Sequence, residues 1–163
     1  MNINIRSAKI EDVPRLVDIN VDSWQNTYDK IIDHDDLFSI DKTKRIQKMI
    51  QDFDKNNYLV ACNDNEIMGF AWYRENENGK YQSEIVALYI DIKYRSLGVG
   101  KKLFDYVKDI LKENNDNLII WCLEENICSR KFYEKIGGKL VDEKNTINFC
   151  DKKYIEVGYI YNI

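Results

Sequence analysis

The chain has 163 residues and a formal net charge of −4 at pH 7. This length predicts a single domain, residues 1–163, large enough to fold without a disulfide or a metal. No apolar run approaches the ~18 residues that cross a bilayer, and the net acidity disfavours nucleic acid as a partner. The four cysteines lack zinc-site spacing and no signal-peptide pattern precedes them, so we expect reduced thiols, no bound metal and a cytoplasmic protein.

The first third of the chain predicts one strand and two helices. Residues 2–6 alternate between polar and apolar, as a strand does. Glu11-Asp12-Val13-Pro14 has the acidic first turn and early proline that begin a helix, and helical spacing continues as far as Trp24. Residues 24–32 carry no period that decides between helix and loop. Residues 41–53 predict a second helix with one apolar face, made of Ile46, Met49, Ile50 and Phe53.

Strand patterns then dominate. The apolar runs 58–62 and 66–74 flank turn residues at 63–65, which predicts a hairpin. After a second turn at 75–79, residues 81–92 form a long β-rich run. These segments predict three consecutive strands.

The second half alternates helices and strands. Gly98 opens a helix with one apolar face that extends to Leu111. Residues 118–123 are continuously apolar, as in a strand covered on both faces. A short helix over 127–136 ends at Gly137-Gly138.

The tail, residues 139–163, predicts two strands around a polar turn. The resulting order, β-α-α-β-β-β-α-β-α-β-β, indicates an α/β (α+β) domain with a mixed β-sheet flanked by helices. The β-rich tail also leaves a homodimer open, because exposed strand edges invite partners.

One loop has the composition of a phosphate-binding turn. Tyr94–Lys102 follows a strand and opens a helix, whose N-terminus offers unpaired N–H donors. Gly98 and Gly100 remove Cβ atoms where an anion would approach the backbone. The alternative is a tight turn with solvated lysines. Neither the P-loop nor the Rossmann spacing fits these glycines. The basic side chains of this stretch are Lys93, Arg95, Lys101 and Lys102.

The order of residues in this loop resembles a known family. Arg95-Ser96-Leu97-Gly98-Val99-Gly100 is similar to the R/Q-x-x-G-x-G/A loop of the GNAT superfamily of acetyl-CoA-dependent N-acetyltransferases. Leu88-Tyr89-Ile90 stands where the fourth strand of that family ends. A second motif, N-x-x-[AS]-x-x-x-Y-x-x-x-G, is matched by Asn126, Ser129, Tyr133 and Gly137.

Two positions depart from the family pattern. Ile92 stands where many members have proline, and Gly138 stands where an aromatic residue is usual. We expect the second departure to loosen the packing after the last helix without affecting the chemistry.

The resemblance implies the GNAT acyl-CoA N-acyltransferase fold and direct acetyl transfer from acetyl-CoA to a primary amine. The acceptor would be a small molecule, polyamines included, or a protein N-terminus. A non-catalytic acyl-CoA-binding or regulatory module on the same fold is the alternative. The implied cofactor-binding residues are Leu88, Tyr89, Ile90, Arg95, Ser96, Leu97, Gly98, Val99, Gly100, Lys101, Asn126, Ser129 and Tyr133.

Acetyl transfer needs a base for the amine and an acid for the leaving thiolate. An amine with a pKa of ~10.4 is neutral in about one molecule in 2,500 at pH 7. Glu84 is the candidate base, because some family members carry a carboxylate at this strand position, whereas others use water. The alternative is that Glu84 is an ordinary carboxylate at a strand edge, without a catalytic role. The resemblance makes Tyr133 the candidate acid, and a core tyrosine is the alternative.

The remaining site residues have structural alternatives. The resemblance implies that a backbone amide near Leu88–Ile90 stabilises the oxyanion and that the Asn126 side chain contacts the pantetheine arm. Asn126 is also a suitable helix N-cap. Trp24 and Tyr28 resemble a W-x-x-x-Y pattern of some bacterial members that shapes the acceptor pocket, and core packing explains them equally well.

Overall fold

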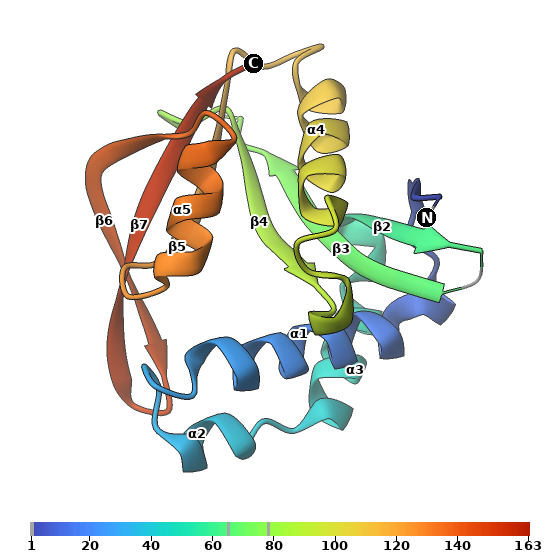
Figure 1. Ribbon diagram of the computed structural model, residues 1–163, viewed down its shortest axis with the longest axis vertical. Helices are drawn as coiled ribbons and strands as arrows, with labels where there is room; N and C mark the ends of the chain where they lie inside the picture. The colour runs from blue at the N-terminus through green and yellow to red at the C-terminus, as the bar shows by residue number, and fades with distance from the viewer. Residues whose placement is uncertain (1, 65, 78) are drawn as a thin grey trace.

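The computed structural model describes residues 2–64, 66–77 and 79–163 (Figure 1). The predicted turns at 63–65 and 75–79 include Asn65 and Asn78, which lie outside the described residues. The strands are β1 (Asn4–Ser7), β2 (Asn57–Asn63), β3 (Glu66–Glu75), β4 (Ser83–Ile90), β5 (Asn117–Leu123), β6 (Lys139–Phe149) and β7 (Lys152–Asn162). The α-helices are α1 (Val13–Tyr28), α2 (His34–Phe38), α3 (Lys42–Gln51), α4 (Val99–Leu111) and α5 (Ile127–Lys135).

In the described part of the chain, seven strands form one mixed sheet with the order β1-β2-β3-β4-β5-β7-β6. Every neighbouring pair is antiparallel except β4 and β5, which are parallel. Helices α4 and α5 cover one face of the sheet, and α1 with α3 covers the other (Figure 1). This arrangement confirms the predicted mixed sheet flanked by helices.

The N-terminal region differs from the expectation in one element. Helix α1 continues through Trp24 to Tyr28, and the short helix α2 follows. Helix α2 has five residues, too few for a hydrophobic period to show in the sequence. Its start is capped by the Asp33 carboxylate, which accepts a hydrogen bond from the Asp35 N–H at 3.1 Å. The Lys152 ammonium, 2.8 Å from Asp36, ties α2 to the β6–β7 hairpin.

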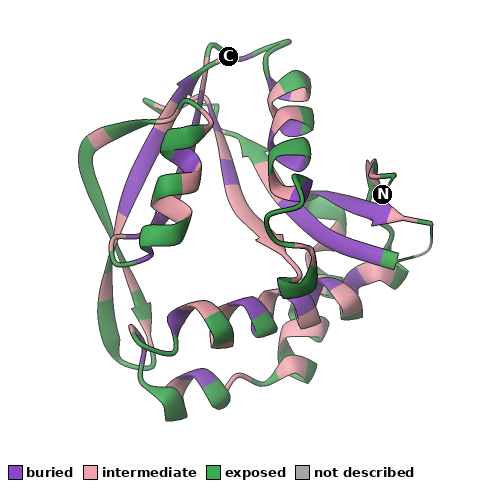
Figure 2. Ribbon diagram, in the orientation of Figure 1, coloured by how far each residue is buried: buried purple, intermediate pink, exposed green. Residues whose placement is uncertain are grey.

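The main core lies between the sheet and α4. Buried side chains of β2, β3, β4, β5 and β7 meet Val99, Leu103 and Val107 there (Figure 2). Strand β6, in contrast, is a largely exposed edge strand. No helix in the described ranges is long and apolar enough to cross a membrane.

The expectation of loose packing at Gly138 is wrong. The Tyr161 ring lies against this glycine, and its hydroxyl donates to the Tyr133 carbonyl at 3.0 Å. A Cβ atom on Gly138 would lie 2.6 Å from the Tyr161 oxygen. An aromatic ring from β7 therefore fills the space beside α5.

The parallel pair β4–β5 opens in the middle of the sheet. The two strands are in register only at Ser83–Ile85 against Leu118–Ile120. A register shift between Trp72 and Tyr73 on β3 marks an irregularity opposite the same stretch of β4. Beyond Ile85 the strands diverge, and the backbone of residues 86–90 has no partner on the β5 side among the described residues.

Candidate active site

A cleft of about 1050 Å³ occupies the gap where β4 and β5 diverge. It is walled by the end of α1, both diverging strands, the loop before α4, and α5. The cleft therefore brings together segments more than 100 residues apart in the sequence. The residues predicted for the site that line it are Trp24, Tyr28, Leu88, Tyr89, Ile90, Arg95, Ser96, Gly98, Gly100, Lys101, Asn126, Ser129 and Tyr133.

The loop before α4 has the backbone shape of an anion-binding turn. Ser96 and Gly98 adopt left-handed conformations, with φ of 63° and 84°. Gly98 caps α4, and the first N–H bonded within the helix is that of Lys102, to the Gly98 carbonyl at 3.0 Å. The preceding N–H groups of the first turn are therefore available to a ligand. Nothing lies within 4 Å of a Cβ built on Gly98, so the backbone there is open to an approaching anion.

Two predicted residues of this loop do not line the cleft. The Leu97 side chain is 54% exposed, whereas the Val99 side chain is buried in the core under the sheet. Only their backbone groups are placed to take part in cofactor binding.

Basic side chains from two elements line the cleft. Arg95, exposed at its mouth, donates from Nε to the Ile90 carbonyl at 3.3 Å. Lys131 and Lys135, from α5, also line it. Sequence analysis missed these two lysines, although their spacing of four residues places them on one helical face. The α4 and α5 side of the cleft can therefore hold a polyanion.

Asn126 and Tyr133 enter the cleft from α5. The Asn126 side chain caps this helix by accepting from the Ser129 N–H at 3.1 Å. Because it also lines the cleft, the capping role and a ligand-binding role are compatible. Burial above all raises the pKa of Tyr133 well above its usual value, so the phenol is protonated at neutral pH.

The aromatic residues of α1 form a wall of the cleft. The Trp24 indole N–H donates to the Tyr89 hydroxyl at 2.8 Å, and the Trp24 and Tyr28 rings meet edge to face at 5.2 Å. The Arg45 guanidinium lies 5.5 Å from the Trp24 ring centre. Trp24 and Tyr28 are thus both packing residues and lining residues.

Glu84 is not among the residues that line the cleft. It lies where β4 is still paired with β5, and its carboxylate accepts from Arg74 Nε at 2.9 Å and Nη2 at 2.6 Å. Glu84 is thus held in an ion pair with Arg74, outside the lining of the cleft.

Another carboxylate does line the cleft. Glu156, on β7, is half-buried, and burial followed by the nearby charge of Glu84 raises its pKa. Sequence analysis missed this residue. In the sequence, the only sign of a special role for Glu156 is that a charged residue stands between the apolar residues Ile155 and Val157.

Of the two cysteines that line the cleft, Cys122 is buried and Cys128 is exposed. Burial raises the pKa of the Cys122 thiol to about 12, so it is protonated at neutral pH. Within the described ranges, no three His, Cys, Asp or Glu side chains are grouped to hold a metal.

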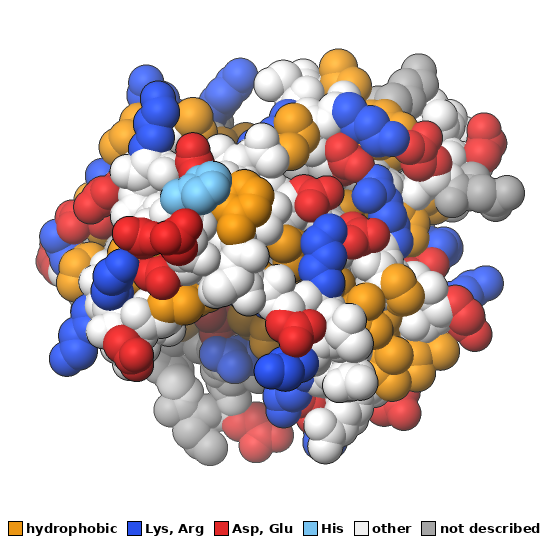
Figure 3. Space-filling view, turned by 90° about the horizontal axis from the view of Figure 1, so that it is seen from below, with side chains coloured by type: hydrophobic (Ala, Val, Ile, Leu, Met, Phe, Trp, Pro, Cys, Tyr) orange, Lys and Arg blue, Asp and Glu red, His pale blue; other side chains and the backbone are white. Residues whose placement is uncertain are grey.

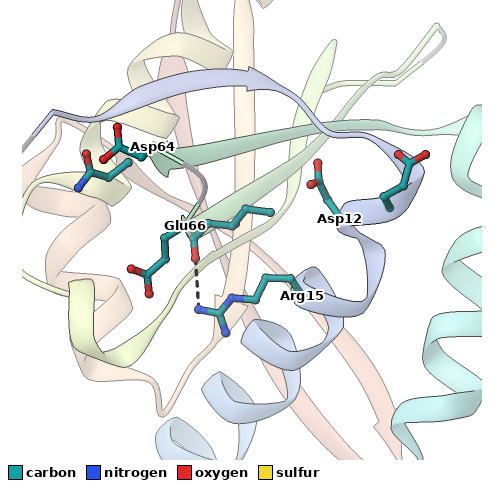
Figure 4. A pocket seen from close by; sticks show the side chains of 7 residues that line it. Asp12, Arg15, Asp64 and Glu66 are labelled. Atoms are coloured by element: carbon teal, nitrogen blue, oxygen red, sulfur yellow. Dashed lines mark hydrogen bonds between the residues drawn. The ribbon is translucent and has the colours of Figure 1, made fainter.

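A second, more open depression lies between α1 and the β2–β3 hairpin and shares no lining residue with the cleft (Figure 4). Three of the five charged residues that line it have partners. The Arg15 guanidinium donates to the Ile67 carbonyl at 3.2 Å, the Asp12 carboxylate pairs with Arg6 at 2.7 Å, and Glu66 pairs with Lys93. The Arg15 contact holds α1 against the hairpin.

Comparison with known proteins identifies what the chain is similar to. The sequence profile of the acetyltransferase (GNAT) family matches residues 15–138. The "Uncharacterized N-acetyltransferase YuaI" of Bacillus subtilis is 27% identical over 147 residues, 88% of this chain and 84% of the relative. The spermidine N(1)-acetyltransferase of Thermoplasma acidophilum is 26% identical over 165 residues, 94% of this chain and 99% of the relative.

A solved structure supports the same fold. The PaiA N-acetyltransferase of Thermoplasma acidophilum, crystallised with coenzyme A, superimposes with a TM-score of 0.78. The comparison covers 100% of both chains at 23% sequence identity.

Proposed function

This chain belongs to the GNAT family of N-acetyltransferases, and we propose that it moves the acetyl group of acetyl-CoA directly onto a primary amine of a small, polyamine-like molecule. The observation that carries the proposal is the cleft between the diverging strands β4 and β5. It combines an anion-binding turn, a protonated tyrosine and an aromatic wall in one space.

The residues on the α4 and α5 side fit the phosphates of CoA. The open N–H groups of the Gly98–Lys101 turn match a pyrophosphate, as a helix N-terminus does in other proteins. Arg95, Lys131 and Lys135 supply positive charge within an otherwise acidic protein. Bound acetyl-CoA supplies a thioester, whose carbonyl carbon is the electrophile.

Two groups of this chain would serve the chemical step. Tyr133 is the proposed acid, because its phenol lines the cleft and is protonated at neutral pH, so it carries the proton that the departing thiolate needs. The unpaired backbone of residues 86–90 would donate an N–H to the oxyanion. Protonated Cys122 supports direct transfer rather than an acyl-enzyme.

Two features favour a small cationic acceptor over a protein N-terminus. We call the part of the cleft formed by α1, β5 and β7 the acceptor side. There Trp24 of α1 packs against Phe149 of β6, with ring centres at 5.2 Å, and this contact restricts access for a polypeptide. The similar Thermoplasma acidophilum protein named for spermidine points to the same substrate class. We place the reaction in the cytoplasm, where the four free cysteines would remain reduced.

The test is the release of free CoA thiol from acetyl-CoA in the presence of single amines. We expect release with short aliphatic di- and triamines, and little release with a peptide bearing a free N-terminus. Tyr133→Phe is the matched control for enzyme-dependent release. Binding of acetyl-CoA without thiol release from any amine would overturn the proposal and favour a non-catalytic acyl-CoA-binding module.

A further inference from the structure

Glu156 is a half-buried carboxylate in the cleft to which sequence analysis assigned no role. Along β7, the alternate residues Val157, Tyr159 and Tyr161 point into the core on the α4 and α5 side. Glu156 therefore points to the opposite face of the sheet. It is paired in register with Leu123, at the end of β5 where the cleft is open.

The surroundings of Glu156 are apolar and aromatic. On the same face of β7, Gly158 lies under the Trp121 ring, which approaches a Cβ built on that glycine to 2.8 Å. Seen from the side of α1 and α2, the surface is hollowed, with hydrophobic side chains inside the hollow and charged groups at its rim (Figure 3). The apolar and aromatic residues that line the cleft with Glu156 include Trp24, Tyr28, Trp121, Leu123 and Ile147.

No cation neutralises Glu156 within the described residues. Glu84, in contrast, is paired with Arg74 at 2.6 Å. The ionisable groups near the Glu156 carboxylate are Glu84 on β4, Tyr28 on α1, Tyr89 on β4 and Cys122 on β5. None of these groups carries a positive charge. A half-buried carboxylate without a counterion is costly, and a cationic ligand would remove that cost.

We infer that Glu156 receives the acceptor: its carboxylate binds the ammonium group of a short aliphatic diamine and accepts the proton that this group loses before acetylation. The inference rests on the proposed function and assigns its acceptor site. The alkyl chain would lie against the aromatic wall, where burial of its methylene groups favours a carbon chain over a carboxylate-bearing amino acid.

Acetyl transfer then proceeds through two proton transfers on the amine and one on the thiolate. The ammonium gives one proton to Glu156, and the nitrogen lone pair forms the N–C bond. The C–S bond then breaks with its electron pair moving to sulfur, and the thiolate takes the Tyr133 proton. The nitrogen loses a second proton, which restores Tyr133, and the proton on Glu156 leaves to solvent. Each turnover converts one ammonium and one thioester into one amide, one thiol and one H⁺.

Glu156→Gln tests the inference, because glutamine keeps the shape and removes the charge. We expect kcat/KM for 1,4-diaminobutane to fall about 100-fold at pH 7, the lower range for loss of a general base. The loss should shrink as pH rises, because more of the amine is then already neutral. The exposed residue Glu113, in the turn after α4 and outside the lining of the cleft, supplies the control Glu113→Gln, which should leave kcat/KM unchanged.

Glu84→Gln separates the two carboxylates. If Glu156 is the base, removal of the neighbouring charge should move the acidic limb of the pH–rate profile to lower pH and preserve the rate at pH 8. A loss in Glu84→Gln as large as that in Glu156→Gln, with the same pH dependence, would overturn the assignment.

Equilibrium binding keeps the inference testable without turnover. Calorimetry of 1,4-diaminobutane with CoA-loaded protein should show binding that weakens at least tenfold in Glu156→Gln, while the affinity for CoA is unchanged. If wild type binds the diamine in a Glu156-dependent way but releases no thiol from acetyl-CoA, the acceptor site stands and the proposed function fails. Equal diamine affinity in both proteins, or no diamine binding in wild type, would overturn the inference.

Discussion

The two sides of the cleft are built in different ways. The α4 and α5 side consists of contiguous segments: one loop with two left-handed residues and one helix with its cap. The acceptor side is assembled from α1, β5 and β7, and Glu156 is more than 120 residues from Tyr28. In the proposed function the first side binds with backbone groups, which depend on local conformation. The second would bind with side chains, which depend on how distant strands are paired. Local sequence therefore encodes the first side far more directly than the second.

The largest expected effect is at the junction of the two sides. Tyr133→Phe removes the proposed proton donor, and we expect kcat to fall about 10²-fold with the affinity for acetyl-CoA unchanged. Steady-state thiol release at saturating substrates measures this.

Tyr161→Phe is the control for this substitution. It removes the hydroxyl that donates to the Tyr133 carbonyl, at a cost of about 1 kcal/mol of stability, and should retain kcat. Turnover of Tyr133→Phe within threefold of wild type would make Tyr133 a packing residue.

Gly100→Val tests whether backbone groups on the α4 and α5 side of the cleft bind the cofactor. A Cβ at this position is in ordinary contact with Ile90 and Phe132, at 3.5 Å, so the apo fold should tolerate a side chain there. At about 100 times Kd, acetyl-CoA should stabilise wild type by ~2.7 kcal/mol, roughly a 5–10 °C rise in Tm. We expect the valine branches to obstruct the anion and abolish most of this shift. An equal shift in the variant would refute backbone recognition at this turn.

Trp24→Leu tests whether side chains on the acceptor side of the cleft bind the amine. It removes the indole N–H that donates to the Tyr89 hydroxyl at 2.8 Å and one face of the aromatic wall. We expect KM for the amine to rise about tenfold, or ~1.4 kcal/mol, because the alkyl chain loses apolar contact worth about two buried methylene groups, with acetyl-CoA binding retained. If KM for acetyl-CoA rises instead, the division between the two sides is wrong.

Arg95→Ala should have a smaller, salt-dependent effect. Arg95 is exposed at the mouth of the cleft, so screening limits its contribution, and we expect a few-fold loss of acetyl-CoA affinity that disappears at about 1 M salt.

The matched control is Lys102→Ala. Lys102 belongs to the same basic stretch but does not line the cleft, and its ammonium donates to the Ile3 carbonyl at 2.8 Å. Equal losses for both variants would mean that general charge, rather than the cleft, attracts the ligand.

The smallest expected effect concerns the stability of the apo protein. Burial and the Glu84 charge raise the pKa of Glu156 in the folded state, so the folded protein favours the protonated carboxyl. Glu156→Gln should therefore be slightly more stable than wild type above the folded pKa. This advantage should fade as the pH falls through that pKa towards the unfolded value of about 4.3. Thermal unfolding of both proteins between pH 4 and pH 8 measures it, and lower stability of the variant at pH 8 would contradict the assigned burial cost.

The order of most elements and the shape of the loop before α4 follow from local sequence. Its helix and strand periods lie within single segments, and the left-handed conformation of Gly98 is a local property of the loop. The N-cap role of Asn126 is local in the same way. Helix α2 escaped prediction because five residues are shorter than the period that identifies a helix.

Which carboxylate faces the cleft depends instead on how distant strands are paired. Glu84 and Glu156 both lie in β-rich runs, and strand alternation alone cannot say which face of the sheet is covered. The pairing of β4 with β5 at three positions keeps Glu84 away from the gap, and the pairing of β3 with β4 places it beside Arg74. The pairing of β7 with β5 carries Glu156 to the point where the gap opens. The divergence of two parallel strands is a property of the whole sheet, and no single segment of the sequence encodes it.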